Sequence, residues 1–178
     1  MEVLKPKILA ISGGISSTSY NRKIITRLKI EFSEVCDILI NDDIVNFPFF
    51  DSGISEEETP NSVKLFLEKV KDADAVLICS PEYVYSIPGV LKNALEWSVA
   101  SVVFTDKPVA LITAATVGNK AHESLILILK TIGAKLTDKT NLLVSGVKGK
   151  ISADGQFIDD ETKRSIYSLM QGLLENIG

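Results

Sequence analysis

The stretch ADAVLICSPEYVYSIPGVLKNALEW, residues 73–97, decides the fold. Residues 73–80 are apolar enough to form a strand that is buried on both faces, as the strands of parallel sheets are. Residues 81–89 follow with two prolines and two tyrosines, which predicts a stiff loop. Residues 88–99 then place apolar side chains at helical spacing. The stretch therefore predicts a strand, a loop and a helix in that order.

The same order recurs along the whole chain. Strand then helix, repeated, is typical of a parallel sheet that is covered by helices on both faces. We therefore predict an α/β fold, a doubly wound parallel sheet of five strands, in one domain over residues 1–178. The remaining strands are expected at 7–11, 35–40, 108–113 and 140–144, and the remaining helices at 19–32, after 61, at 121–132 and from Asp159 or Asp160 to 177.

Composition and charge exclude several classes of protein. The chain has 178 residues, of which 46% are hydrophobic and 24% charged, an ordinary globular composition that argues against disorder. The net charge is −4, and nucleic acid binds to clustered Lys and Arg, so no nucleic-acid partner is predicted. The apolar runs are far shorter than a membrane span, so no membrane partner is predicted either.

The cysteines and the start of the chain indicate a reducing compartment. Cys36 and Cys79 lie in apolar runs without a partner at metal-ligand spacing. We therefore expect two buried thiols rather than a disulfide, an iron–sulfur cluster or another metal site. Residues 1–7 lack the apolar stretch of a signal peptide, so a cytoplasmic protein is expected.

Doubly wound sheets bind ligands outside the carboxyl ends of their strands, where the strand order reverses. The loops of interest are then 12–21, 81–89 and 114–120. The first reads SGGISSTSYN, and its glycines, hydroxyls and following helix start predict a phosphate site. It has neither the lysine of a Walker loop nor the glycine spacing of a Rossmann fingerprint. The structural alternative is a capped helix after a Ser/Gly turn.

The other two loops contain residue types that can border a flat ring. Tyr83 and Tyr85 lie between two prolines in the loop after the third strand. The loop after the fourth strand has small residues that permit close approach, and Gly118 permits a tight turn. On spacing alone, tyrosines that pack on neighbouring helices explain the first of these loops better than a ligand does.

Residues 80–97, SPEYVYSIPGVLKNALEW, resemble the signature of the NADPH-dependent FMN reductase family. That family includes quinone, azo-dye and chromate reductases. Its signature reads Pro-Glu-Tyr-Asn, a short variable stretch, Pro-Gly-Val-Leu-Lys-Asn-Ala, and then an acid-Trp pair. The resemblance extends over the whole chain in element order and loop position. The matching residues are Pro81, Glu82, Tyr83, Pro88, Gly89, Val90, Leu91, Lys92, Asn93, Ala94, Glu96 and Trp97.

The first loop is similar to the family's phosphate loop, with departures. Gly14 stands where the family usually has serine, and Ser16 stands where it usually has arginine. A charge-assisted contact to phosphate is therefore lost at position 16. Val84 replaces a frequent asparagine, so only main-chain contacts to the flavin are expected there. The matching residues of the first loop are Gly13, Ser19 and Asn21.

The resemblance implies a flavodoxin-like fold with strand order 2-1-3-4-5, a bound FMN, and NADPH or NADH as hydride donor. The acceptor would be a small molecule such as a quinone, an azo compound, a metal oxyanion or free flavin. The flavin does the hydride chemistry, so no catalytic side chain is named. The residues expected to bind the cofactor are Gly13, Ser16, Thr18, Ser19, Asn21, Pro81, Glu82, Tyr83, Val84, Thr116, Val117 and Gly118.

The family commonly assembles as dimers or tetramers, so a homodimer or homotetramer is expected here. Tyr83, Tyr85, Ile87 and Trp97 would supply an aromatic interface, unless Trp97 lies in the core. The loop at 41–60 would cover a neighbouring subunit's site or pack locally.

Two other functions stay open. The departures at Gly14, Ser16 and Val84 are compatible with a non-catalytic flavin-binding module that carries electrons or regulates. A phosphate-binding α/β protein with another ligand is the third interpretation. His122, the only histidine, has no partner at motif spacing. We expect it on the surface at the start of a helix rather than in catalysis.

Overall fold

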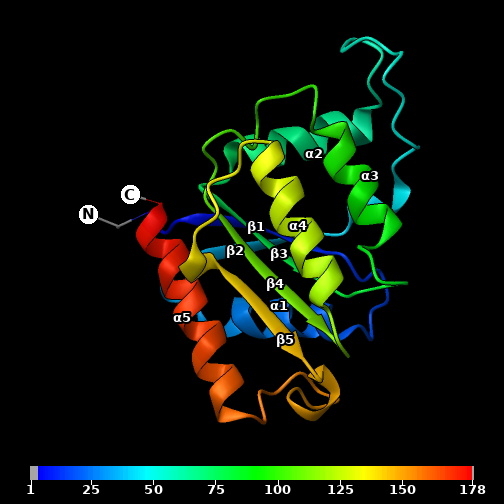
Figure 1. Cartoon of the computed structure of the whole chain (residues 1–178). Coiled ribbons are helices and arrows are strands. Elements are labelled where there is room, and N and C mark those ends of the chain that lie inside the picture. Colours follow the sequence, from blue (N-terminus) through cyan, green and yellow to red (C-terminus); the bar gives the residue numbers. More distant parts are fainter. Residues whose placement is uncertain (1–3, 178) are drawn as a thin grey trace.

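The computed structural model describes residues 4–177 (Figure 1). Residues 1–3 and 178 lie outside the described part of the chain. The expectation about the first seven residues therefore falls partly on undescribed residues, and so does the domain boundary at 1–178.

The described residues form one sheet of five parallel strands, as the sequence predicts. Its order is β2-β1-β3-β4-β5, which is the order that the family resemblance implies. Ile8 of β1 lies opposite Ile38 on one side and Ala75 on the other. Every residue of β3 and of β4 is buried, which explains their continuous apolar runs. The strands are β1 (Lys7–Ser12), β2 (Asp37–Asn41), β3 (Ala75–Ser80), β4 (Val109–Ala115) and β5 (Asn141–Ser145).

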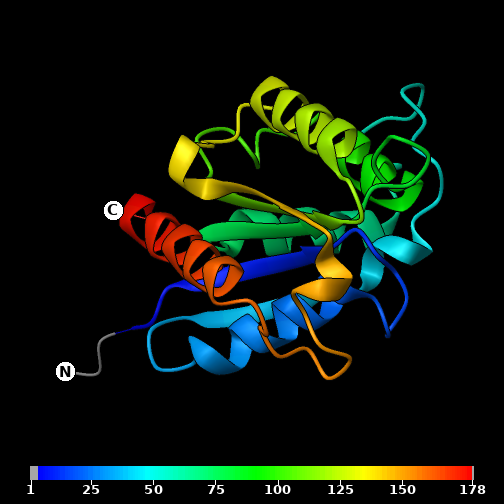
Figure 2. The same ribbon diagram turned by 60° about the horizontal axis from the view of Figure 1, so that its bottom comes forward.

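Helices cover both faces of this sheet (Figure 2). Successive residues of a strand point to opposite faces, so β1 contributes Leu9 and Ile11 to one core and Ile8 and Ala10 to the other. On the first face lie α2 (Asn61–Asp72), α3 (Gly89–Trp97) and α4 (Asn119–Thr131); on the second lie α1 (Tyr20–Glu31) and α5 (Asp160–Asn176).

The predicted elements all occur, with ends that differ by about two residues, as helix and strand ends commonly do. The structure adds three short 3-10 helices that the sequence did not predict. They are η1 (Asp43–Asn46), η2 (Asp138–Thr140) and η3 (Val147–Gly149).

The long connection between β2 and α2 is bonded to α3. The carbonyl of Pro48 accepts hydrogen bonds from Nδ2 of Asn93 and Nε1 of Trp97, each at 2.9 Å. Oδ1 of Asn93 accepts the amide of Phe50 at 2.8 Å, and the Phe50 ring meets Trp97 edge-on. Trp97 is 5% exposed, so it lies in the core. The connection packs on its own chain at these residues.

Both cysteines are free and buried, as expected. Burial raises the pKa of the Cys79 thiol far above its ordinary value, so this thiol stays protonated. Within residues 4–177, no group of three or more His, Cys, Asp or Glu is placed to hold a metal ion. No helix in the same range is both long and apolar enough to cross a membrane.

Candidate functional site

The three loops that the sequence points to meet at one edge of the sheet. Because β1 lies between β2 and β3, the strand order reverses at β1. The amide of Gly13 donates to the carbonyl of Cys79 at 2.9 Å, which joins the first loop to the end of β3. The loop after β3 reaches the loop after β4, where Oε1 of Glu82 accepts the amide of Gly118 at 3.2 Å. This edge is where doubly wound sheets bind ligands.

The first loop presents donors that the protein itself does not use. Within the described residues, the amides of residues 14–17 have no hydrogen-bond acceptor. Ser16 and Thr18 are exposed, and their hydroxyls share one hydrogen bond of 2.8 Å, which leaves one of the two free to donate. Ser19 occupies the N-cap position of α1, but its side chain makes no capping bond. Free amides, hydroxyls and an uncapped helix start suit an anion, so this donor set fits the phosphate of FMN.

The two glycines of this loop pack closely against serine side chains. A Cβ built on Gly13 would lie 2.6 Å from Oγ of Ser80 and 3.0 Å from its Cβ. A Cβ on Gly14 would lie 3.1 Å from Cβ of Ser19 and still closer to its hydroxyl. A serine at position 14, as the family usually has, therefore requires Ser19 to move.

Asn21 faces inward. Its side chain is buried, and Nδ2 donates to the carbonyl of Ala114 at 3.3 Å. Its Oδ1 accepts the thiol of Cys79 at 3.3 Å. These bonds hold the start of α1 against the ends of β3 and β4. The side chain thus positions the loop, and only the backbone of Asn21 remains to face a phosphate.

The loop after β3 forms a tight hairpin. The amide of Tyr83 donates to the carbonyl of Ser86 at 2.9 Å, and the reverse bond is 3.0 Å long. The two residues between them, Val84 and Tyr85, have φ values of 51° and 54°. This left-handed backbone favours Gly and Asn, and it is unfavourable for a β-branched residue by about 1–2 kcal/mol. Strained backbone of this kind gathers at ligand sites.

Glu82 is engaged in capping α4. Its Oε2 accepts the amides of Lys120 at 2.9 Å and Ala121 at 3.0 Å, besides the bond from Gly118 to Oε1. A carboxylate at a helix N-terminus satisfies unpaired amides and the positive end of the helix dipole. The side chain of Glu82 therefore joins two walls of the site.

The loop after β4 is held by hydrogen bonds from the end of β5 and from the residue that follows β5. Gly146 donates its amide to the carbonyl of Thr116 at 3.0 Å, and the hydroxyl of Ser145 donates to the carbonyl of Val117 at 2.6 Å. Gly118 has φ 94°, and a Cβ there would lie 2.7 Å from Leu143. Glycine is therefore needed at this turn.

The edge between these loops has an open apolar surface. Tyr83 is 54% exposed, Val84 96% and Val117 51%. Pro81, at the start of the loop after β3, is buried. The amide of Tyr83 is used inside the hairpin, whereas those of Val84 and Val117 have no acceptor among residues 4–177. Exposed apolar side chains beside free amides fit a flat ring with polar edges.

His122 lies in the first turn of α4, at the helix start where the sequence predicts it, but it is only partly exposed. It is half-buried, and its Nδ1 lies 2.9 Å from Oγ1 of the buried Thr113. Burial lowers the pKa of His122 below its ordinary value. The sequence could not reveal this pairing, because it depends on α4 folding back onto β4.

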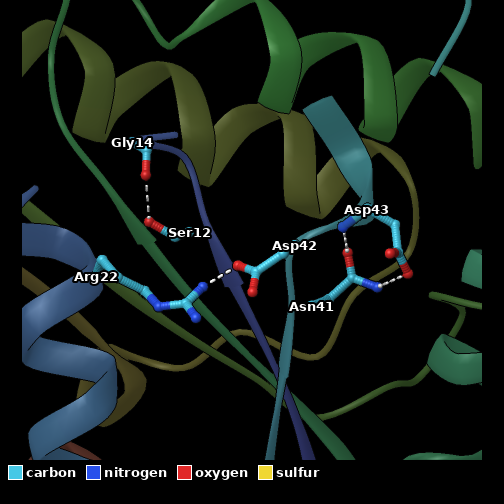
Figure 3. Close-up of polar contacts among 6 residues, drawn as sticks. All are labelled: Ser12, Gly14, Arg22, Asn41, Asp42 and Asp43. Carbon is cyan, nitrogen blue, oxygen red and sulfur yellow. Dashed lines mark hydrogen bonds and ion pairs between the residues drawn. The ribbon is translucent and has the colours of Figure 1, made fainter. Parts of the chain in front are cut away.

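Arg22 is a charged neighbour of the first loop that the sequence analysis did not single out. It lines a cavity of about 310 Å³ together with Ser16 and Ser17. Its guanidinium forms an ion pair with Asp42, which follows β2 (Figure 3). A larger cavity of about 510 Å³ lies at the amino ends of β1 and β2, away from the three loops.

The family model described as NADPH-dependent FMN reductase matches residues 6–148, which is more than half of the chain and contains all three loops. The chain belongs to this family. An NAD(P)H-dependent FMN reductase of Pseudomonas aeruginosa is 30% identical, over 94% of this chain and 92% of its own. A quinone reductase of Escherichia coli K12 is 27% identical, over 89% of this chain and 88% of its own.

The fold of the reductase family is also found among solved structures. The flavoenzyme NAD(P)H:acceptor oxidoreductase FerB of Paracoccus denitrificans superposes with a TM-score of 0.84 and 21% identity, covering 97% of each chain. This likeness supports the flavodoxin-like architecture of the present reductase.

Proposed function

We propose that this chain binds FMN on its three loops and passes reducing equivalents from NADPH or NADH to a small acceptor. Membership of the FMN reductase family supports the activity. The observation that carries the proposal for this chain is the convergence of the three loops, with free donors at one end and exposed apolar side chains at the other. A phosphate and a flat ring need these two environments side by side.

Each of the expected residues would take a role in this arrangement. Gly13, Ser16, Thr18, Ser19 and the backbone of Asn21 would hold the phosphate. The remaining residues would border the ring, with Glu82 acting through its backbone and its cap on α4. They are Pro81, Glu82, Tyr83, Val84, Thr116, Val117 and Gly118.

FMN supplies, when bound, a ring that accepts a hydride and releases two electrons. The protein would orient this ring, and the amides of Val84 and Val117 would stabilise negative charge on it. The open surface would let donor and acceptor reach the same face in turn. A quinone, an azo compound, a metal oxyanion or free flavin would each fit such a surface as acceptor.

We also propose one domain, a homodimer or homotetramer, and a cytoplasmic location. Two free, buried thiols are compatible with a reducing compartment. Ile87 and Trp97 are buried, so an aromatic interface would rest on the exposed Tyr83 and Tyr85. Light scattering of the purified protein measures the assembly, and a monomer at micromolar concentration would contradict it.

The test of the function has two steps. Purified protein is first stripped of any flavin and titrated with FMN, with quenching of flavin fluorescence as the readout. The loaded protein is then mixed with NADPH or NADH and a quinone. We expect turnover of about 1 per second or faster, as for ordinary enzymes. Absence of FMN binding contradicts the proposal, and binding without turnover favours the electron-carrier alternative.

A further inference from the structure

The cavity beside the first loop contains one cation and one anion. Its lining includes Ser16 and Ser17 of the loop, Arg22 and Thr26 of α1, and Asp42 after β2. Arg22 extends across this space from the first turn of α1 to the Asp42 carboxylate (Figure 3). The cavity, of about 310 Å³, is therefore continuous with the surface on which the phosphate loop presents its hydroxyls.

The first loop itself offers only neutral donors. Residues 12–21, SGGISSTSYN, contain no lysine or arginine. A phosphate monoester carries about two negative charges at neutral pH, and neutral donors bind such a group about half as strongly as charged ones. Arg22 is the next residue along the chain, and its guanidinium lies in the same cavity as Ser16 and Ser17. A guanidinium can also bind phosphate through two parallel hydrogen bonds.

The present partner of Arg22 holds it only weakly. The Asp42 side chain is 62% exposed, and exposed ion pairs contribute little to stability. A dianion in the cavity would attract the guanidinium more strongly than the single charge of this solvated carboxylate does. Exchange of partners therefore costs the protein little.

We propose that Arg22 is a binding residue for a phosphate monoester, and that it exchanges Asp42 for the ligand when the site fills. The proposal rests on the proposed function, in which two ligands carry such a group. They are FMN, through its 5′-phosphate, and NADPH, through its 2′-phosphate. Asp42 acts as the resting partner that keeps the guanidinium in the cavity.

The test compares ligands that differ only in the monoester. Apoprotein with Arg22→Gln is titrated with FMN and with riboflavin, again by fluorescence quenching. If Arg22 binds the phosphate monoester of FMN, affinity for FMN falls at least about tenfold, whereas affinity for riboflavin changes less than about twofold. If Arg22 binds the phosphate monoester of NADPH, FMN binding is unchanged and the preference for NADPH over NADH in kcat/KM falls about tenfold.

Three further variants make the result specific. Lys23→Gln removes the same charge from the next residue, whose ammonium lies 4.9 Å from the Tyr20 ring centre. It should leave unchanged both the FMN-to-riboflavin affinity ratio and the NADPH-to-NADH preference. Arg22→Lys keeps the charge without the bidentate geometry and should fall between wild type and Arg22→Gln. Asp42→Asn removes the competing carboxylate and should tighten monoester binding about two- to threefold.

The outcomes separate this proposal from the one it rests on. Wild-type protein that binds neither FMN nor riboflavin contradicts both. The role of Arg22 alone is overturned if the wild-type protein binds FMN and Arg22→Gln changes neither ratio. The two ratios are the affinity for FMN over that for riboflavin, and kcat/KM with NADPH over that with NADH. Equally weakened binding of FMN and riboflavin also overturns the role of Arg22, because that result reports general damage to the site.

Discussion

Oε2 of Glu82 accepts the backbone amide of Ala121 at 3.0 Å, which joins the loop after β3 to the first turn of α4. The same carboxylate also accepts the amides of Gly118 and Lys120. One side chain therefore caps a helix and sets the relation between two walls of the site. The side chain of the family's motif glutamate is therefore engaged in this chain in joining two loops.

We expect Glu82→Gln to destabilise the protein by about 2 kcal/mol, because the amide of glutamine turns a donor toward amides that need an acceptor. Urea unfolding of the apoprotein measures this loss without any cofactor. Glu123→Gln is the matched control on the same helix. Glu123 is exposed and pairs only with Lys120 at 2.8 Å, so its loss should stay within about 0.5 kcal/mol. Equal stability of the two variants would contradict the capping role.

A substitution at the tip of the hairpin after β3 is expected to stabilise the protein. Val84 has φ 51°, and asparagine tolerates this backbone whereas valine does not. We expect Val84→Asn to raise the free energy of unfolding by about 1 kcal/mol, which corresponds to about 2–4 °C in Tm. Val102→Asn is the control, since Val102 is 79% exposed and is not among the residues with positive φ. A lower Tm for Val84→Asn would show that the tip is not strained.

His122 predicts a dependence of stability on pH. Its pKa is lowered in the folded protein, chiefly by burial and against the effects of Asn141 and Glu123. The unfolded chain therefore binds a proton more readily, and stability falls as the pH drops below about 6.5, the ordinary histidine value. The loss stops once the pH is below the folded pKa.

His122→Asn places an amide near the position of Nδ1 without a titrating group. We expect this variant to lose the slope of Tm against pH between about 5 and 7 that wild type shows. Because His122 is the only histidine, its NMR titration gives the folded pKa directly. A value at or above the ordinary one would contradict the prediction.

Sequence predicted the fold because the signals for it are local. The run at 75–79 is apolar throughout since β3 is buried on both faces, and the helices show their inner faces at regular spacing. Strand order then followed from family resemblance, and the three loops followed from the rule that ligands bind at the carboxyl edge. Both steps needed no side-chain geometry.

Side-chain pairing was the part that sequence could not give. Glu82 and Ala121 are 39 residues apart, and Arg22 and Asp42 are 20 apart. Each pair depends on the direction in which a side chain leaves its loop or helix. The left-handed backbone at Val84 was also hidden, because valine gives no signal for it. The asparagine that the family often has at this position was the available hint.

The hydrogen bonds to Pro48 give the last prediction, which concerns the connection between β2 and α2. Asn93→Ala removes one of the two donors to the Pro48 carbonyl and leaves the part-buried amide of Phe50 without its acceptor. We expect the free energy of unfolding to fall by about 2 kcal/mol and the connection to be released from α3.

Trp97 is the only tryptophan and donates to the same carbonyl, so its emission should shift to longer wavelength as water reaches it. Lys92→Gln, which breaks only the exposed pair with Glu96 at 2.5 Å, should leave the emission unchanged. Unshifted emission in Asn93→Ala would mean that Trp97 and Phe50 hold the connection without the Asn93 amide, and that the motif asparagine serves another purpose.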